Sequence, residues 1–156
     1  MPTLIVLRHA KAEDGFGKDD ADRELTGRGR RDASAAGDWL RSQGRTPGLV
    51  LCSPAVRTRQ TLDELRLDAD VRYEPLIYAN DAEELLELVR ETGDEVGVLL
   101  LVGHNPSVHQ LVHDLAPDGA PPGFPTCSLA VIDLPDAWSA VRLGSGDLTA
   151  YRDPRA

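Results

Sequence analysis

The chain has 156 residues, of which 41% are hydrophobic and 28% are charged, as expected for one soluble globular domain spanning residues 1–156. Its formal net charge is −9, which argues against a nucleic-acid partner or an acidic membrane surface, because both are usually met by a basic protein surface. No apolar run is long enough to span a membrane, and the first residues lack the basic region of a signal peptide, so we expect a cytoplasmic protein.

Short apolar runs alternate with amphipathic stretches along the chain. Strands are predicted where an apolar run is short, and helices where apolar residues recur every three or four positions after a capping residue. In chain order, the sequence predicts a strand at Thr3–Leu7, a loop at Ala12–Glu24, a helix from Thr26 to about Gln43, a strand at Leu49–Cys52, a helix beginning at Ser53-Pro54, a strand near Val71–Tyr73 and a helix from about Asp81 to Glu91.

The second half begins with Gly97–Val102, the most continuous apolar run, which is typical of a central strand covered on both faces. Asn105-Pro106 repeats the signal of a capping residue followed by proline, and predicts a helix to about Leu115. Residues 116–125 hold four Pro and two Gly and are predicted to form a loop. Two closing strands are predicted at Cys127–Leu134 and Ala140–Leu143, joined by a hairpin around Asp136–Trp138.

Strands and helices alternate four times in this prediction. Such alternation indicates an α/β protein, here a three-layer α/β/α domain with a mostly parallel sheet and antiparallel strands at an edge. The two cysteines, Cys52 and Cys127, lie in apolar runs outside any CxxC pattern. We therefore expect them to be buried thiols in a reducing compartment.

Basic and polar residues follow three of the predicted strands. In an open α/β sheet, ligands bind beyond the carboxyl ends of the strands, so these residues are expected to meet at one edge. The two helices predicted to begin there would add unpaired N–H groups, which favour an anion. A phosphoryl group needs several fixed donors, and two guanidinium groups suit it. The residues are Arg8 and His9 after the first strand, Ser53 and Arg57 after the second, and His104 and Asn105 after Gly97–Val102.

His9 is the candidate nucleophile of this edge. Nearby positive charge lowers the pKa of an imidazole, so His9 among cationic groups is expected to be neutral. A neutral imidazole with a free nitrogen can attack phosphorus and split phosphoryl transfer into two displacements. The residues therefore predict an enzyme that removes a phosphoryl group from an anionic substrate.

Other chemistries lack their sequence signatures. Four residues separate Cys52 from Arg57, whereas a cysteine phosphatase loop needs five, and no G-x-x-x-x-G-K-[ST] segment occurs. His109 and His113 are four apart like a metal pair, but no Glu stands beside His109 as in a HExxH helix. We therefore expect no metal site at this histidine pair, and we interpret Asp19–Asp22 as a solvated loop face.

Four segments resemble the histidine phosphatase superfamily, in the right order between residue 4 and about residue 115. Leu7-Arg8-His9-Ala10 resembles its RHG motif, with Ala in place of Gly. Ser53–Thr61 resembles its SPxxRxxQT segment, and Val102–Pro106 resembles its VGHNP segment. Asp22–Gly29 is similar to a stretch of the short SixA-like phosphohistidine phosphatases.

The resemblance implies a phosphoglycerate mutase-like fold and a phosphatase in which His9 is phosphorylated and which uses no metal ion or organic cofactor. It also implies a phosphate pocket made by Arg8, Arg57 and His104; Ser53 and Asn105 are further candidate substrate-binding residues. The implied substrate is the phosphohistidine of a phosphotransfer protein, held in a shallow, open site. We expect a monomer or a weak oligomer.

Two positions depart from the family pattern. Gly15 stands where many members have Asn, and no carboxylate falls clearly where they have the Glu that protonates the leaving oxygen. Glu74, Asp81 and Glu83 are candidate acids. Because phosphohistidine has a good leaving group, this departure favours it over an alcohol phosphate. The alternatives are a phosphatase for a small phosphomonoester, such as a sugar or glycerate phosphate, and a phospho-ligand binding module without turnover.

Overall fold

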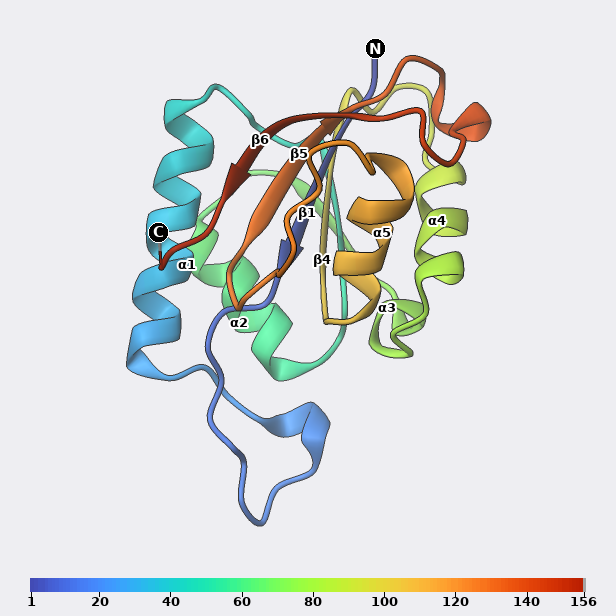
Figure 1. Cartoon of the computed structure of the whole chain (residues 1–156). Helices are drawn as coiled ribbons and strands as arrows, with labels where there is room; N and C mark the ends of the chain where they lie inside the picture. Colours follow the sequence, from blue (N-terminus) through green and yellow to red (C-terminus); the bar gives the residue numbers. More distant parts are fainter. Residues whose placement is uncertain (156) are drawn as a thin grey trace.

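Six strands form one sheet in the order β3-β2-β4-β1-β5-β6 in a computed structural model that describes residues 1–155 (Figure 1). Neighbouring strands pair in parallel from β3 to β1, whereas β5 pairs antiparallel with both β1 and β6. The predicted sheet, mostly parallel with antiparallel pairing toward one edge, is therefore confirmed. The strands are β1 Thr3–Arg8, β2 Leu49–Cys52, β3 Asp70–Tyr73, β4 Val98–Gly103, β5 Leu129–Asp133 and β6 Asp147–Arg152.

Helices cover both faces of the sheet, which gives the predicted three layers. Helices α1 (Gly27–Ser42) and α2 (Val56–Leu65) pack on one face, and α4 (Ala82–Arg90) and α5 (Ser107–Leu115) pack on the other (Figure 1). A short helix, α3 (Pro75–Tyr78), precedes α4. Within residues 1–155, no helix has the length and apolar character needed to cross a membrane.

The central strand β1 shows how an apolar run becomes the middle of the sandwich. Leu4 and Val6 belong to the core cluster shared with α4 and α5, whereas Ile5 and Leu7 belong to the cluster shared with α1 and α2. All four side chains are fully buried, and burying each contributes about 1.5–3 kcal/mol. An uninterrupted apolar run is needed because alternate side chains enter different cores.

The predicted start of α2 at Ser53-Pro54 is wrong. The helix begins at Val56 with Ala55 as its N-cap. The Ser53 hydroxyl lies 3.3 Å from the Ala55 backbone nitrogen, whose N–H it accepts, and 2.8 Å from the Nε2 atom of His104. Ser53 therefore belongs to the turn before the helix, and the capping pattern in the sequence lies two residues too early.

The predicted start of α5 at Asn105-Pro106 is also early, since the helix begins at Ser107. The Ser107 N–H donates to the Asn80 side-chain oxygen at 3.0 Å, so the cap comes from a distant turn. The Asn105 side chain donates instead to the Phe124 carbonyl at 2.8 Å. A capping residue far away in the sequence cannot be read from local spacing.

The last predicted strand, at Ala140–Leu143, is wrong as well. Trp138 and Val141 are buried in the core beside α4, and the Trp138 indole N–H donates to the Val96 carbonyl at 2.7 Å. A turn at Gly144, whose φ is +74°, then leads to β6. This apolar segment fills the core as a short 3₁₀ turn (Trp138–Ala140) and does not pair with the sheet.

The register of the parallel strands brings their carboxyl ends level. Arg8 at the end of β1 pairs with Gly103 at the end of β4, and Cys52 at the end of β2 pairs with Val102. The long segment between β1 and α1 extends beyond this edge and is the lowest part of the chain in Figure 1. The residues that follow the three strands therefore share one edge of the sheet.

Candidate active site

His9 is held with one ring nitrogen occupied and the other free. Its Nδ1 atom lies 2.8 Å from the Ala10 carbonyl oxygen. A carbonyl only accepts, so Nδ1 carries the proton and the lone pair of neutral imidazole is on Nε2. Backbone hydrogen bonds to Gly103 and Cys127 fix the residue between β4 and the start of β5. Only 7% of His9 is exposed.

His104 lies beside His9, with 5.4 Å between the ring centroids. Its Nε2 atom is 2.8 Å from the Ser53 hydroxyl, which also accepts the Ala55 N–H. When the Ser53 hydroxyl donates its proton to His104 Nε2, the proton of neutral His104 is on Nδ1. That Nδ1 atom is buried and has no partner within residues 1–155.

Both imidazoles are neutral at physiological pH. The pKa of His9 falls to about 3, chiefly because the ring is buried; the hydrogen bond to Ala10 opposes this shift, and the charges of His104, Arg57 and Arg8 add to it. Burial, followed by the charge of Arg57, lowers the pKa of His104 to about 4. His9 is therefore ready to act as a base or a nucleophile without first losing a proton.

The two arginines reach the same edge from β1 and from the first turn of α2. Arg57 is 6% exposed, and its Nη atoms bind the backbone oxygen and the carboxylate of Asp20 at 2.8 and 3.1 Å. Arg8 is half-buried and donates through Nη1 to the Phe124 carbonyl at 3.2 Å. Burial, and then the charge of Arg57, lower the pKa of Arg8. In both arginines the Nε atom is buried without a partner in the described part of the chain.

Three buried nitrogen atoms of this neighbourhood are thus unpaired among the described residues: the Nε–H donors of Arg8 and Arg57, and His104 Nδ1, which is a third donor in the tautomer described above. Buried donors almost always have partners, and one left unpaired costs about 1–3 kcal/mol. Oxyanion oxygens would satisfy such donors with charge-assisted hydrogen bonds. The structure therefore brings the four predicted basic residues together with Ser53, in an arrangement suited to a tetrahedral oxyanion.

Asp20 is part of this site, although its segment was interpreted as a solvated face. Residues 20–22 form a short 3₁₀ turn, and the Asp20 carboxylate accepts from Arg57 and, at 2.7 Å, from the Tyr78 hydroxyl. These hydrogen bonds lower the pKa of Asp20 to about 2. The Tyr78 ring packs edge-on against His104, with 5.6 Å between centroids. No local sequence pattern indicates the contacts of Asp20, because Arg57 is 37 positions away in the sequence and Tyr78 is 58 positions away.

The three candidate acids lie elsewhere. Asp81 caps α4, accepting the Glu83 N–H at 2.9 Å. Glu83 lines an outer cavity beside Arg90, and Glu74 lines another beside Leu88. Across the described residues, no hydrogen bond or ion pair joins these carboxylates to the basic side chains of the site. The carboxylate that does contact Arg57, Asp20, is ionised at neutral pH and is a poor proton donor.

Asn105 is half-buried; its side-chain nitrogen donates to the Phe124 carbonyl, and its side-chain oxygen is buried without a partner in the described chain. No group of three or more His, Cys, Asp or Glu within residues 1–155 is placed to hold a metal ion.

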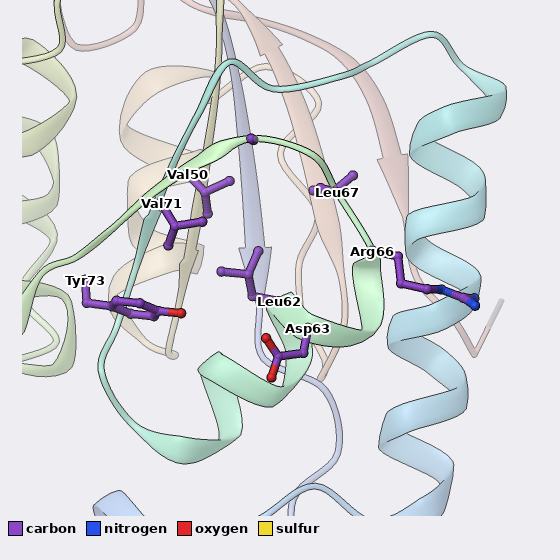
Figure 2. Close-up of a pocket in the computed structure, with 8 residues that line it drawn as sticks. Val50, Leu62, Asp63, Arg66, Leu67, Val71 and Tyr73 are labelled. Atoms are coloured by element: carbon purple, nitrogen blue, oxygen red, sulfur yellow. The ribbon is translucent and has the colours of Figure 1, made fainter.

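The cavity in Figure 2, about 210 Å³ in volume, lies between α2 and the β2–β3 edge. Its lining includes Leu62, Val71 and Tyr73 but none of the four basic site residues, so its position does not define the site.

The depressed pKa values predict how stability depends on pH. The unfolded chain protonates His9 and His104 near pH 6.5, whereas the folded chain keeps them neutral down to about 4 or 3. The free energy of unfolding therefore has its full value, as far as these two histidines are concerned, above about pH 6.5, and it decreases as the pH falls toward the folded pKa values. We therefore compare the free energy of unfolding of wild type and His104→Asn, measured by urea unfolding at pH 7 and at pH 4. The deficit of the variant relative to wild type should be on the order of 3 kcal/mol smaller at pH 4 than at pH 7, because only wild type carries the cost of keeping His104 neutral. If the free energies of unfolding of the two proteins fall by the same amount between pH 7 and pH 4, His104 does not have a lowered pKa in the folded protein.

Comparison with known proteins gives a consistent set of relatives. The family model described as the histidine phosphatase superfamily (branch 1) matches residues 4–85. An uncharacterized protein of Mycobacterium tuberculosis (strain H37Rv) is 36% identical over 158 residues, covering 96% of this chain and 100% of that protein. An uncharacterized protein of Mycobacterium leprae is 35% identical, with the same coverage of each chain.

Solved structures match over nearly the whole chain. A candidate phosphohistidine phosphatase SixA from Nakamurella multipartitia is 32% identical, with a TM-score of 0.90 and coverage of 99% of this chain and 97% of that chain. Its counterpart from Agrobacterium tumefaciens is 31% identical, with a TM-score of 0.84 and 99% coverage of both chains. A protein histidine phosphatase SixA complexed with tungstate is 27% identical, with a TM-score of 0.84 and coverage of 98% and 97%.

Proposed function

Because this chain belongs to the histidine phosphatase superfamily, we propose that it is a phosphohistidine phosphatase whose His9 takes the phosphoryl group from a phosphorylated protein. Arg8, Arg57 and His104 hold the phosphoryl oxygens, with support from the buried Ser53, which lies against His104, and from the half-buried Asn105. No metal ion or organic cofactor takes part. We further propose that a single domain of residues 1–156 acts in a reducing cytoplasm, where the buried thiols of Cys52 and Cys127 stay free.

The free Nε2 lone pair of His9 carries the proposal. Its Nδ1 proton is tied to the Ala10 carbonyl, so the ring cannot turn its protonated nitrogen toward a substrate without losing that bond. A nucleophile of fixed tautomer beside unpaired donors meets the requirements of phosphoryl transfer, which depends on positioning and charge stabilisation.

Two displacements follow from this arrangement. In the first, Nε2 of His9 forms a bond to phosphorus, the bond from phosphorus to the substrate imidazole breaks, and the departing imidazole takes a proton from water. In the second, water attacks phosphorus, the bond to Nε2 breaks and its electron pair returns to neutral His9; inorganic phosphate leaves, and a proton released by the attacking water neutralises the hydroxide left from the first step. The N–H groups of Arg8, Arg57 and His104 stabilise the charge on the equatorial oxygens in both steps.

The acidic groups of the site favour phosphohistidine over an alcohol phosphate. Asp20 has a pKa of about 2 and His104 a pKa of about 4, so both are deprotonated at neutral pH. Neither group can efficiently protonate a departing alkoxide, whereas an imidazole leaves readily once it is protonated. The names of the SixA relatives point to the same substrate class.

A side-by-side turnover assay tests the substrate class. We expect kcat/KM to be highest for a phosphohistidine-bearing phosphotransfer protein, lower for an aryl phosphate and lowest for sugar and glycerate phosphates. The reason is leaving-group ability at a site without a protonated carboxyl. A sugar or glycerate phosphate that outperforms the phosphoprotein would instead assign the small phosphomonoester activity. Binding of all three without turnover would assign a non-catalytic module.

A further inference from the structure

Two imidazoles of α5 and one carbonyl of the following loop converge outside the basic site. The Nε2 atoms of His109 and His113 are 3.2 Å apart. They lie 2.8 and 3.0 Å, respectively, from the Pro121 carbonyl oxygen. Both histidines are half-buried and Pro121 is buried. The four-residue spacing on α5 places the two rings on one face of the helix.

Only one combination of ring tautomers satisfies this cluster without a cation. If both rings carry a proton on Nε2, the two lone pairs of the Pro121 carbonyl can accept both N–H groups, with the two hydrogens side by side. If either ring carries its proton on Nδ1, its Nε2 lone pair faces the lone pairs of the Pro121 carbonyl at 3.0 Å or less. A cation among the three atoms would turn all of these lone pairs into ligands.

The spacing of the three atoms matches one face of a coordination polyhedron. A tetrahedral ion with bonds of about 2.0–2.1 Å holds its ligand atoms about 3.3 Å apart, and octahedral geometry brings them to about 2.9 Å. The separations in the cluster run from 2.8 to 3.2 Å. Imidazole nitrogens with a carbonyl oxygen suit first-row divalent ions such as Zn²⁺ and Ni²⁺.

We propose that His109, His113 and the Pro121 carbonyl bind a first-row divalent transition-metal ion, with water completing its coordination. The site is structural and does not depend on the proposed phosphatase activity. It revises the expectation from the sequence, in which the missing Glu argued against a metal. The absence of that Glu excludes a HExxH hydrolase centre but leaves room for a pair of imidazoles with a backbone oxygen.

The surroundings suit such a site. The Phe124 ring stacks on His109 at 5.8 Å and 12°, which fixes the plane of that imidazole. Asp114, next to His113 in the sequence, lies half-buried on the same helix, and the chain carries a net charge of −9. Negative potential attracts a divalent cation, and an ordered ring loses less freedom when it binds.

The metal would join α5 to the proline-rich loop of residues 116–125, a loop without an assigned role. That loop also carries Phe124, whose carbonyl accepts hydrogen bonds from Arg8 and Asn105. Binding at the imidazole pair would therefore hold the loop and, through it, the Arg8 guanidinium. We expect slower amide exchange over residues 117–126 when the ion is bound, since opening of the loop would break a metal–oxygen bond.

Calorimetric titration of the untagged protein with Zn²⁺ and Ni²⁺ tests the proposal, with Mg²⁺ as the negative control. We expect one ion per chain for Zn²⁺ and Ni²⁺. Affinity should fall at least about tenfold in His109→Gln and in His113→Gln, because each variant removes one ligand. The double variant keeps side-chain N–H groups that can donate to Pro121, and it keeps His9 and His104. It should show neither saturable binding nor slowed exchange in the loop.

Two results would overturn the proposal. Wild-type protein without saturable Zn²⁺ or Ni²⁺ binding would mean that the two rings only share the Pro121 carbonyl as hydrogen-bond donors. Binding of unchanged affinity in the double variant would place the ion elsewhere, for instance at His9 and His104. Thermal unfolding of each metal-free variant checks that the substitutions leave the fold intact.

Discussion

Replacing His9 with alanine is expected to lower kcat/KM for an aryl phosphate by at least about 10³-fold. The expected loss is large because a covalent route disappears with its nucleophile, and the remaining donors can only assist direct attack by water. An aryl phosphate is the right substrate for this comparison, since its good leaving group keeps the first displacement independent of a general acid.

A second variant separates chemistry from folding. His9→Asn keeps a side-chain N–H that can donate to the Ala10 carbonyl, but it has no counterpart of the Nε2 lone pair. We expect it to lose as much activity as His9→Ala while keeping its unfolding temperature and its affinity for tungstate close to those of wild type. If either variant keeps more than about a tenth of the wild-type rate, His9 is not the nucleophile.

Replacing Arg57 with alanine should cost nearly as much, with a loss of about 10²–10³-fold in kcat/KM. Arg57 is buried, carries an Nε–H that is unpaired among the described residues and contributes to the low pKa of both histidines. Its loss removes a fixed donor to the transition state and part of the positive potential that keeps the imidazoles neutral. Arg57→Lys should recover only part of the activity, because lysine lacks the planar fork.

Arg59 provides the matched control on the same helix. Its guanidinium is exposed, donates to the Pro54 carbonyl at 2.8 Å and lies 4.4 Å from the centre of the Tyr73 ring. Arg59→Ala should change kcat/KM by less than about threefold, as is usual for a surface substitution. Equal losses in Arg57→Ala and Arg59→Ala would indicate a general effect of charge on α2 and would contradict a specific role for Arg57.

Loss of the ion pair between Arg57 and Asp20 is a second explanation for a lower kcat/KM in Arg57→Ala, and Asp20→Asn tests it. Asp20 occupies both Nη atoms of Arg57, and a phosphoryl group must share or displace these contacts. If the loss in Arg57→Ala came from breaking this pair, Asp20→Asn would lose a similar amount. We expect Asp20→Asn to change kcat/KM by less than about tenfold, because the Asp20 side chain is 54% exposed and water screens its charge, and because the amide oxygen can still accept from Arg57.

Local patterns predicted the sheet and the edge at which the site lies. The runs that became β1, β2 and β4 are apolar on both faces. Arg8 is the last residue of β1, His104 directly follows β4, and Arg57 comes five residues after β2. Once these three strands pair in parallel, their carboxyl ends lie at one edge of the sheet, and Arg8, Arg57 and His104 come together there. Each strand and the basic residue that follows it are close in sequence, so this prediction was possible from one chain.

Contacts between distant residues could not be predicted in this way. Asn80 caps α5 from 27 positions away, and Asp20 meets Arg57 and Tyr78 from 37 and 58 positions away. The four-residue helix α3 is too short to show a helical period, so the place of Tyr78 beside His104 had no signal. Strand β6 was missed because its residues, Asp147–Arg152, are mostly polar and only partly buried.

Transfer of the phosphoryl group to the Nε2 atom of His9 can be observed as a covalent intermediate. The experiment is rapid mixing with a phosphohistidine protein, followed by an alkaline quench that preserves phosphoramidates and by peptide mass spectrometry. We predict one phosphate per chain on the peptide that contains Arg8 and His9, located on His9 and absent from His9→Asn. Phosphate located on His104, or on any other side chain of the wild-type enzyme, would contradict His9 as the nucleophile.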